Sequence, residues 1–175
     1  MNKVLLMGQA NVGKSVFFNR LAGASVAESN YPGTTVDYAK GRMLLENKYV
    51  ELIDVPGTFS LQPKDRAEEV AVKMLEEEKD ALVICIIDAS KVERGLYLAL
   101  EIIERGYPVL VALNMWDMAK NVNVKVDVKK LEQILGVPVV PTVATRGEGF
   151  EELVSRMREA TPVEIEEIIK NVGGG

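Results

Sequence analysis

Residues Gly8 to Ser15 have the types and the spacing of a loop that binds phosphate groups. The segment reads Gly-Gln-Ala-Asn-Val-Gly-Lys-Ser and lies between an apolar run and a helix-like stretch. Glycines let the backbone curl so that successive N–H groups face one anion, a lysine reaches the outer phosphates, and a serine hydroxyl ligates Mg²⁺. The segment therefore predicts a nucleoside triphosphate site formed by Gly8, Asn11, Val12, Gly13, Lys14, Ser15 and Val16.

A second segment, Asp54-Val-Pro-Gly57, follows a strand-like apolar run, and ligands of open α/β sheets collect where such strands end. We expect Asp54 to hold Mg²⁺ through a water molecule and the Gly57 N–H to meet the third phosphate. Between the two motifs lies Tyr31-Pro-Gly-Thr-Thr35, a turn-rich stretch whose Thr35 could close over Mg²⁺ and the third phosphate. These five residues alone are compatible with a switch and with an ordinary surface loop.

A third motif, Asn114-Met-Trp-Asp117, concerns the base. It follows an apolar run, so Asp117 is expected at the carboxyl end of a strand, where its two oxygens can accept the two neighbouring N–H groups on the edge of guanine. Adenine offers no such pair of donors, and the motif therefore predicts a preference for guanine. We expect Asn114 to brace the neighbouring loops, Met115 to pack against the base, and the backbone of Ala144 and Thr145 to complete the pocket.

The elements that must position these motifs alternate between strand-length apolar runs and amphipathic helical stretches, as in an α/β P-loop domain. Most connections are long enough for crossover helices, which predicts a mostly parallel six-stranded sheet with helices on both faces. A hairpin turn at Asn47-Lys48 predicts one antiparallel edge strand. Strands are predicted at 4–7, 39–45, 49–54, 81–88, 109–114 and 137–143, and helices after the phosphate loop and at 67–77, 94–104, 128–135 and 150–158.

Composition narrows the classes of function. The chain has 175 residues, a formal net charge of −5, no histidine, and one cysteine, Cys85, within an apolar run. The acidic balance argues against a nucleic-acid partner, which needs a basic face, and the lack of histidine excludes imidazole chemistry. We expect Cys85 to be a buried structural thiol, and the shortness of the apolar runs predicts a soluble piece that is not secreted.

One domain, residues 1–160, carries all three motifs. Residues 161–175 are predicted to add a last helix and a glycine-rich end. Thr161-Pro-Val-Glu164 has the form of a capping box with proline at the first helical position, and isoleucines follow it at helical spacing. This terminal segment is the expected start of a further helical or membrane region.

The order of the three motifs resembles the Era-like branch of P-loop GTPases, and their detail resembles the cytosolic G domain of the ferrous iron transport protein B family. The resemblance spans about residues 3 to 160. It rests on Asn-Tyr-Pro-Gly-Thr-Thr-Val-Asp37, Asp-Val-Pro-Gly-Thr-Phe-Ser-Leu61, Leu-Asn-Met-Trp-Asp117, Val-Ala-Thr-Arg-Gly147, and the stretch Phe-Asn-Arg-Leu-Ala-Gly23 after the phosphate loop.

The resemblance implies a GTP-hydrolysing domain at the cytoplasmic face of the cell membrane, coupled to a membrane-embedded region that imports ferrous iron. It implies Mg²⁺ held by Ser15, Thr35 and Asp54. It also allows for a homo-oligomer formed through the switch face, which consists of residues 31–35 and 57–61. The chain also resembles potassium-activated GTPases, in which K⁺ bound by Asn11 would supply positive charge during hydrolysis. The catalytic residues that we expect are Lys14, Asn11, Thr35 and Gly57.

The chain departs from the family pattern at several positions. Gln9-Ala10 replaces the usual Asn-Pro, Met115 stands where most GTPases carry a lysine, and Thr58 replaces the water-orienting glutamine of signalling GTPases. Because a threonine has no amide to share between water and phosphate, we expect slow hydrolysis unless a potassium ion assists.

Two other interpretations stay open at this point. One is a regulatory module whose nucleotide state matters while its own hydrolysis is negligible. The other is an Era-like factor that acts on ribosomes or RNA, which the acidic balance disfavours. Glu68 and Glu69 follow the second motif and could be proposed as general bases, but their spacing favours a solvated helix face.

Overall fold

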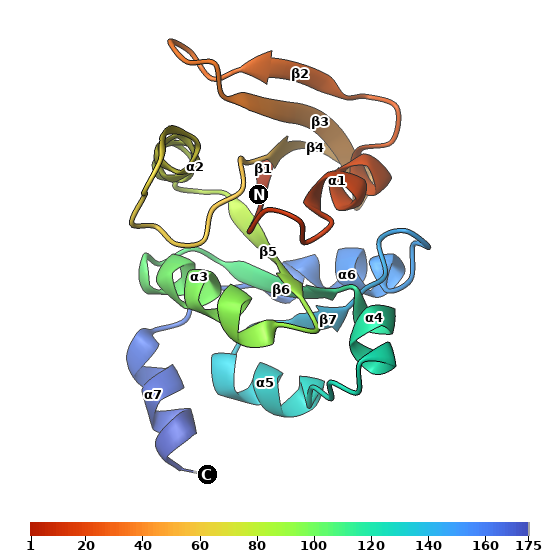
Figure 1. Cartoon of the computed structure of the whole chain (residues 1–175), viewed down its shortest axis with the longest axis vertical. Helices are drawn as coiled ribbons and strands as arrows, with labels where there is room; N and C mark the ends of the chain where they lie inside the picture. Colours follow the sequence, from red (N-terminus) through yellow and green to blue (C-terminus); the bar gives the residue numbers. More distant parts are fainter. Residues whose placement is uncertain (175) are drawn as a thin grey trace.

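A seven-stranded, mostly parallel sheet forms the centre of the molecule, in the order β2-β3-β4-β1-β5-β6-β7 (Figure 1). The computed structural model describes residues 1–174, and Gly175, the end of the predicted glycine-rich terminus, lies outside the described residues. β3 is antiparallel to both of its neighbours, whereas the pairs from β4 to β7 are parallel. The strands span Lys3–Gly8 (β1), Ala27–Asn30 (β2), Asp37–Leu45 (β3), Lys48–Asp54 (β4), Leu82–Asp88 (β5), Val109–Asn114 (β6) and Val139–Pro141 (β7).

The central strands are apolar along their length because helices cover both of their faces. Every residue of β6 is buried, and so is every residue of β5 before Asp88. Parallel strands that are buried on both sides have continuous rather than alternating apolar sequences. In β1, Leu5 and Met7 face one core and Val4 and Leu6 face the other, so the two-residue period of the strand separates two cores.

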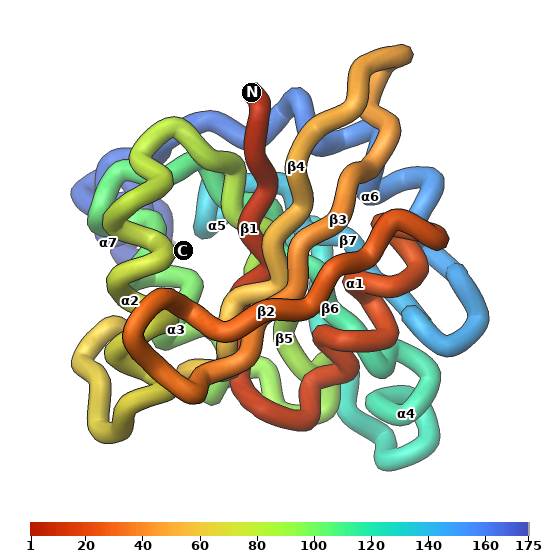
Figure 2. Tube along the Cα trace, turned by 90° about the horizontal axis from the view of Figure 1, so that it is seen from above, coloured from red at the N-terminus to blue at the C-terminus, as the bar shows by residue number. Residues whose placement is uncertain are grey.

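Helices lie on both faces of the sheet, as the sequence predicts (Figure 2). One core lies under α2, α3, α5 and α7, and the other lies under α1 and α6. No helix within residues 1–174 is both long enough and apolar enough to span a bilayer. The helices span Lys14–Ala22 (α1), Arg66–Glu77 (α2), Val92–Glu104 (α3), Trp116–Asn121 (α4), Val128–Leu135 (α5), Phe150–Arg156 (α6) and Ile165–Gly173 (α7), and a 3-10 turn at Met157–Glu159 follows α6.

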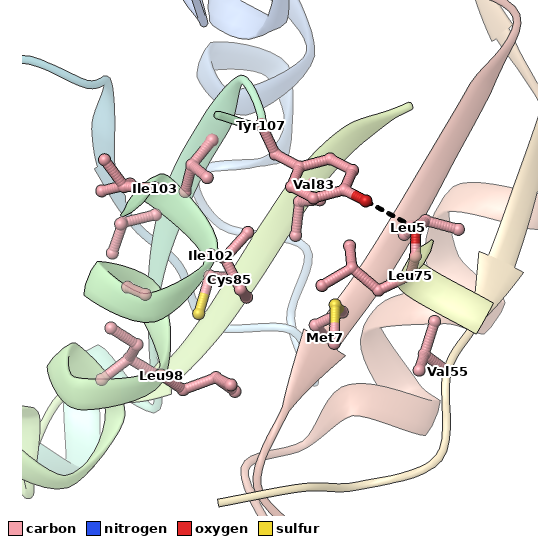
Figure 3. Close-up of a cluster of buried hydrophobic side chains, with 14 of the residues drawn as sticks. Leu5, Met7, Val55, Leu75, Val83, Cys85, Leu98, Ile102, Ile103 and Tyr107 are labelled. Carbon is pink, nitrogen blue, oxygen red and sulfur yellow. Dashed lines mark hydrogen bonds between the residues drawn. The ribbon is translucent and has the colours of Figure 1, made fainter. Parts of the chain in front are cut away.

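Figure 3 shows the core beneath α2 and α3, where side chains of β1 and β5 meet the two helices. Cys85 is fully buried there, and burial raises the pKa of its thiol to about 12. The Tyr107 hydroxyl donates a 2.8 Å hydrogen bond to the Leu75 carbonyl, so its polar tip has a partner inside the core. The prediction of a buried structural thiol is confirmed.

The sheet differs from the prediction at its antiparallel end. The sequence predicts six strands, whereas the structure has a seventh, β2, whose four residues are all exposed. A strand exposed on both faces carries no apolar alternation, so hydrophobic periodicity could not reveal it. β2 pairs outside β3, and the antiparallel strand is therefore not at the edge. The hairpin turn is formed by Glu46 and Asn47, both with positive φ, and not by Asn47-Lys48, because Lys48 already pairs with Leu45.

Two helices also differ from the prediction. The helix α4 was not predicted, because its six residues are too few to show a helical period and include only one buried residue, Ala119. The predicted start of the last helix at Pro162 is wrong: α7 begins at Ile165, and its N-cap, Glu164, makes no side-chain cap. Ile168 of α7 is 5% exposed and belongs to the core under α5 and α3, so this helix packs onto the same body as the strands.

Candidate nucleotide-binding site

The phosphate-binding loop connects β1 to α1 and lines a cavity of about 250 Å³. β1 ends at Gly8, α1 begins at Lys14, and Gly13, at φ 82°, turns the chain into the helix. The free N–H groups at the start of a helix favour an anion, which suits this turn to phosphate. The structure thereby brings together in one cavity the predicted residues Asn11, Gly13, Lys14, Ser15, Val16 and Gly57.

Two positions of the loop accept only glycine. A Cβ atom on Gly8 would lie 2.6 Å from the Ile86 carbonyl oxygen, and one on Gly13 would lie 2.5 Å from Asn114 Nδ2. Gly13 also has a left-handed conformation that other residues adopt at a cost. Close packing of the loop against the ends of β5 and β6 therefore fixes both glycines of the motif.

Lys14 and Asp54 form an ion pair, with 2.5 Å between Lys14 Nζ and Asp54 Oδ1. The two side chains are 12% and 13% exposed, so each charge compensates the other in a partly desolvated place. The pair forms because β4 lies beside β1, with Asp54 in register with Leu6. Ser15 and Asp54 offer hydroxyl and carboxylate oxygens, and this is the donor type that Mg²⁺ takes.

The segment that follows β4 packs directly against the phosphate loop. The Thr58 N–H donates to the Gly8 carbonyl at 3.0 Å, and a Cβ atom on Gly57 would lie 3.1 Å from the Ala10 nitrogen. Thr58 is 1% exposed, and its hydroxyl donates to the Ser60 carbonyl at 2.7 Å. The Thr58 side chain thus stabilises its own turn and does not line the phosphate cavity.

Glu68 holds the same segment from below, which corrects the expectation that it lies on a solvated helix face. It is 7% exposed, and its carboxylate accepts hydrogen bonds from the N–H groups of Lys64 at 2.8 Å and Phe59 at 3.5 Å. Glu69 is exposed, as expected. The spacing between Glu68 and Asp65, the N-cap of α2, could have predicted this position. An acidic residue three positions after an N-cap folds back to accept hydrogen bonds from the start of the helix.

Helix α3 contacts both the phosphate loop and the segment that follows β4. The Glu101 carboxylate accepts a hydrogen bond from the Leu61 N–H at 3.2 Å, and the Gln9 side chain donates to the Arg94 carbonyl at 2.8 Å. Neither contact follows from a local sequence pattern, because the partners lie far apart in the chain.

The loop between β2 and β3, residues 31–36, lies against α2 (Figure 2). The Tyr31 hydroxyl donates to the Glu77 carboxylate of α2, and this hydrogen bond raises the pKa of Tyr31. The Thr34 hydroxyl donates to the Tyr31 carbonyl at 2.8 Å, which closes the loop on itself. Thr35 is exposed and does not line the phosphate cavity, so the structure does not bring it to the other predicted Mg²⁺ ligands.

Asn114, at the end of β6, ties the phosphate loop to the loop after β7. Its side chain is buried, and Nδ2 donates to the Val12 carbonyl at 2.8 Å. Its Oδ1 accepts hydrogen bonds from the Thr142 hydroxyl at 3.1 Å and from the Ala144 N–H at 3.0 Å. All polar atoms of the amide except one hydrogen are thus used to join three segments of the chain.

Asp117 lies in the first turn of α4, immediately after β6. Met115, at φ 58°, forms the left-handed N-cap of that helix, and its Cε atom would lie 3.7 Å from a Cβ atom on Gly13. Arg146, in the loop after β7, has its Nη2 atom 3.8 Å from Asp117 Oδ2. The predicted base-reading carboxylate and the loop that carries Ala144 therefore lie at the same end of the sheet.

Arg20 of α1 also contacts this site, although the sequence did not predict it. Its Nε donates to the Ala144 carbonyl at 2.7 Å, and its Nη2 donates to the Thr145 carbonyl at 3.1 Å. No local pattern distinguishes Arg20 from other exposed residues of α1, because its partners lie more than a hundred residues later in the chain.

Comparison with known proteins agrees with this geometry. Residues 2–157 match the family described as ferrous iron transport protein B. The chain is 41% identical over 152 residues to the Fe(2+) transporter FeoB of Salmonella typhimurium, a match that covers 85% of this chain and 20% of that protein. The corresponding protein of Escherichia coli K12 is 39% identical. The chain therefore spans about a fifth of the length of the curated relatives it matches.

Solved structures of relatives have the same fold. The cytosolic domain of the T. maritima FeoB iron transporter in its GMPPNP form is 40% identical, with a TM-score of 0.83, and the match covers 91% of this chain and 63% of that one. A mutant S. thermophilus NFeoB bound to GDP is 34% identical, with a TM-score of 0.84, over 93% of this chain and 63% of that one. The predicted α/β class is confirmed, and the chain belongs to the ferrous iron transport protein B family.

Proposed function

We propose that this chain is a GTP-binding domain that hydrolyses GTP to GDP and phosphate with Mg²⁺. The observation that carries the proposal is the buried amide of Asn114, which joins the phosphate loop at Val12 to the base end at Ala144. The phosphate cavity and the end of the sheet that carries Asp117, the carboxylate proposed to bind guanine, are thus connected at the carboxyl ends of parallel strands. The GMPPNP and GDP named for two relatives support a guanine nucleotide as the ligand.

The role of each residue follows from its chemistry. Lys14 and the N–H groups of the phosphate loop bind the phosphates, and Asp117 accepts the N–H groups of guanine. When bound, Mg²⁺ neutralises charge on the phosphates during transfer to water. Ser15 and Asp54 would hold it, and Thr35 would join them when its loop closes. Because Lys14 is paired with Asp54, an incoming phosphate that attracts Lys14 would release the Asp54 carboxylate for the metal.

Hydrolysis is slow in this proposal, and potassium stimulates it. The Thr58 hydroxyl is engaged with the Ser60 carbonyl, so it does not orient a water molecule, and the Gly57 N–H is left to meet the third phosphate. Asn11 lines the phosphate cavity with a left-handed backbone, and its amide oxygen suits a monovalent cation. A cation there would stabilise the negative charge that develops as the phosphate leaves.

The test is phosphate release from GTP and Mg²⁺ at matched ionic strength in KCl and in NaCl. We expect a several-fold faster rate in KCl, loss of this difference in Asn11→Ala with GDP affinity retained, and an unchanged difference in Asn19→Ala, which alters an exposed asparagine outside the cavity. Equal rates of about 10⁻⁴ to 10⁻³ per second in both salts would refute potassium stimulation.

A second candidate function is a nucleotide-state switch without appreciable hydrolysis. The observation that favours it is the hydrogen bond from Tyr31 to Glu77, which holds residues 31–36 against α2 and keeps Thr35 out of the phosphate cavity. A third phosphate that binds Thr35 would draw the loop from this position, and the loop would then report the nucleotide state.

In the whole protein, we propose that the nucleotide state drives or gates the entry of ferrous iron through a membrane-embedded region, with this domain on the cytoplasmic side. Its relatives, Fe(2+) transporters of which this chain matches only about a fifth, support the proposal. The switch face, residues 31–35 and 57–61, is the proposed site of self-association. Lys14→Ala in the full-length protein should abolish ferrous iron uptake by cells that depend on it, and unchanged uptake would refute the coupling.

A further inference from the structure

A separate cavity, of about 580 Å³, lies between the first turn of α3 and the loop that joins α4 to α5 (Figure 1). It shares no lining residue with the phosphate cavity, and none of the predicted nucleotide-binding residues lines it. Its volume falls within the range of about 300 to 1,000 Å³ that is typical of sites for small ligands. The proposed nucleotide site therefore does not account for this cavity.

The less exposed side of the cavity is an apolar floor. It is formed by Val92, Val124, Val126 and Leu131, which are all half-buried and pack against the core beneath α3 and α5. Valine side chains have few rotamers, so a floor that is anchored on the core keeps its shape without a ligand. A ligand with an apolar body would bury that body against this floor.

The exposed residues around the floor are mostly cationic. Lys91, Arg94 and Lys125 line the cavity, and none of them forms an ion pair within residues 1–174. Of the two carboxylates that also line it, Asp127 is the N-cap of α5 and accepts a hydrogen bond from a backbone N–H of that helix at 3.1 Å. The other, Glu93, is exposed and without a cationic partner in the same residues. The rim of the cavity thus has three cations against one free carboxylate.

An apolar floor under a cationic rim suits an anion that carries an apolar body. A guanidinium binds phosphate oxygens through its planar fork, and lysines add point charges. A phosphate monoester has about two negative charges at neutral pH, which balances this rim better than the single charge of a carboxylate.

Gln9 connects this cavity to the phosphate cavity. Its side chain donates to the Arg94 carbonyl at 2.8 Å, and Gln9 itself lines the phosphate cavity. Arg94 therefore belongs to one cavity and holds a residue of the other. A ligand that fixes the first turn of α3 also fixes the hydrogen-bond partner of Gln9, so the phosphate loop has less freedom to lose when a nucleotide binds.

The geometry points to a regulatory site for a phosphate monoester with an apolar body, formed by Lys91, Arg94 and Lys125 around the apolar floor, whose occupancy tightens nucleotide binding through Gln9. Linkage is reciprocal, so a bound nucleotide tightens the binding of the ester as well. The ester site stands on its own geometry, whereas the linkage to the nucleotide rests on the proposed function.

The ester site is tested with phenyl phosphate, whose binding is followed by the backbone amide NMR signals of the chain. Saturation with GDP and Mg²⁺ keeps the probe out of the phosphate cavity. We expect saturable shifts of the signals of residues 90–94 and 124–127, which line the separate cavity. Inorganic phosphate lacks the apolar body and phenol lacks the charge, so each should bind more weakly than phenyl phosphate.

Substitutions at the rim separate this site from general charge attraction. Arg94→Gln and Lys125→Gln should each weaken phenyl phosphate about fivefold, and Glu93→Gln should tighten it about twofold, because it removes the opposing charge. The matched control is Lys129→Gln, which alters an exposed lysine of α5 outside the cavity and should change nothing. Shifts that do not saturate, or equal affinities in Arg94→Gln and the unsubstituted chain, would overturn the ester site.

The same chemistry occurs in a free phosphate ester and in the headgroup of phosphatidic acid. Sedimentation with phosphatidylcholine vesicles that contain phosphatidic acid distinguishes these sources. Binding that Arg94→Gln abolishes would assign the site to the lipid, and lack of binding would assign it to a free ester.

The linkage is tested by calorimetry of GDP binding with and without saturating phenyl phosphate. We expect the ester to lower the dissociation constant of GDP about fivefold in the unsubstituted chain and to leave it unchanged in Gln9→Ala. No effect in the unsubstituted chain, or the same effect in Gln9→Ala, would overturn the linkage. If the chain does not bind GDP, the proposed function fails with the linkage, whereas saturable shifts at residues 90–94 and 124–127 would still establish the ester site.

Discussion

Asn114 connects the proposed nucleotide site to the rest of the fold through a single side chain. Its amide is buried between three segments of the chain and bonds to Val12, Thr142 and Ala144. All three partners are buried, so water would not replace the hydrogen bonds of the amide if the side chain were removed. The residue that arranges the site is therefore also a cross-link of the fold.

Asn114→Ala should lower the free energy of unfolding by about 3 kcal/mol, because it leaves buried hydrogen-bonding groups unsatisfied. Asn171→Ala is the matched control, since the Asn171 amide donates to two backbone carbonyls at an exposed place. We expect that change to cost less than about 1 kcal/mol. Urea unfolding of both variants measures the difference, and equal losses would contradict the role assigned to Asn114.

Residues within short motifs could be predicted from sequence because their spacing is set by local backbone geometry. The glycines, Lys14 and Ser15 of the phosphate loop are of this kind. Arg20 and Glu101 could not be predicted, because each acts on a loop that only the folded chain brings near. Glu68 was misjudged as solvated, since its burial depends on where the preceding loop folds.

At the scale of elements, burial decided what the sequence could predict. Strands covered on both faces, such as β5 and β6, were found because they are continuous apolar runs. The exposed edge strand β2 and the short helix α4 were missed because neither buries enough apolar surface to leave a period. The polar turn between β3 and β4 was misplaced by one residue, because either pair of residues could have formed it.

Helix α7 supplies the prediction at this scale. Ile168→Ala should lower the free energy of unfolding by about 2 to 4 kcal/mol, because Ile168 fills the core under α5 and α3. The neighbouring Ile169 is 65% exposed, and Ile169→Ala should cost less than about 0.5 kcal/mol. Chemical unfolding of both variants tests whether α7 belongs to the same cooperative unit, and a small effect of both would show that it does not.

At the scale of the whole molecule, the stability should fall above pH 9. Burial raises the pKa of Cys85 from 9.0 to about 12, so the folded chain keeps a proton that the unfolded chain releases between these values. The unfolded state then binds fewer protons, and the free energy of unfolding decreases as the pH rises.

For this one group, the loss between pH 9 and pH 10 is about 1 kcal/mol. Unfolding in urea at the two pH values, for the natural chain and for Cys85→Ala, isolates the contribution of the thiol from that of Tyr31 and Tyr107, whose pKa values are also raised. The substitution should flatten the decrease by that amount, and parallel decreases in both proteins would contradict the assignment.

The strand order β4-β1-β5-β6-β7 places the phosphate end and the base end of the proposed site at opposite ends of one edge of the sheet. At a spacing of about 4.8 Å between neighbours, the edge from β4 to β7 is about 19 Å long. At one end lie Asp54 and the loop after it, which would bind Mg²⁺ and the third phosphate. At the other end lie Asp117 and the loop after β7, which would bind the base. In the proposed GTPase, substitutions around Asp117 would therefore act mainly on the choice of base, and substitutions around Asp54 mainly on the phosphates, with Asn114 as the side chain that joins the two ends.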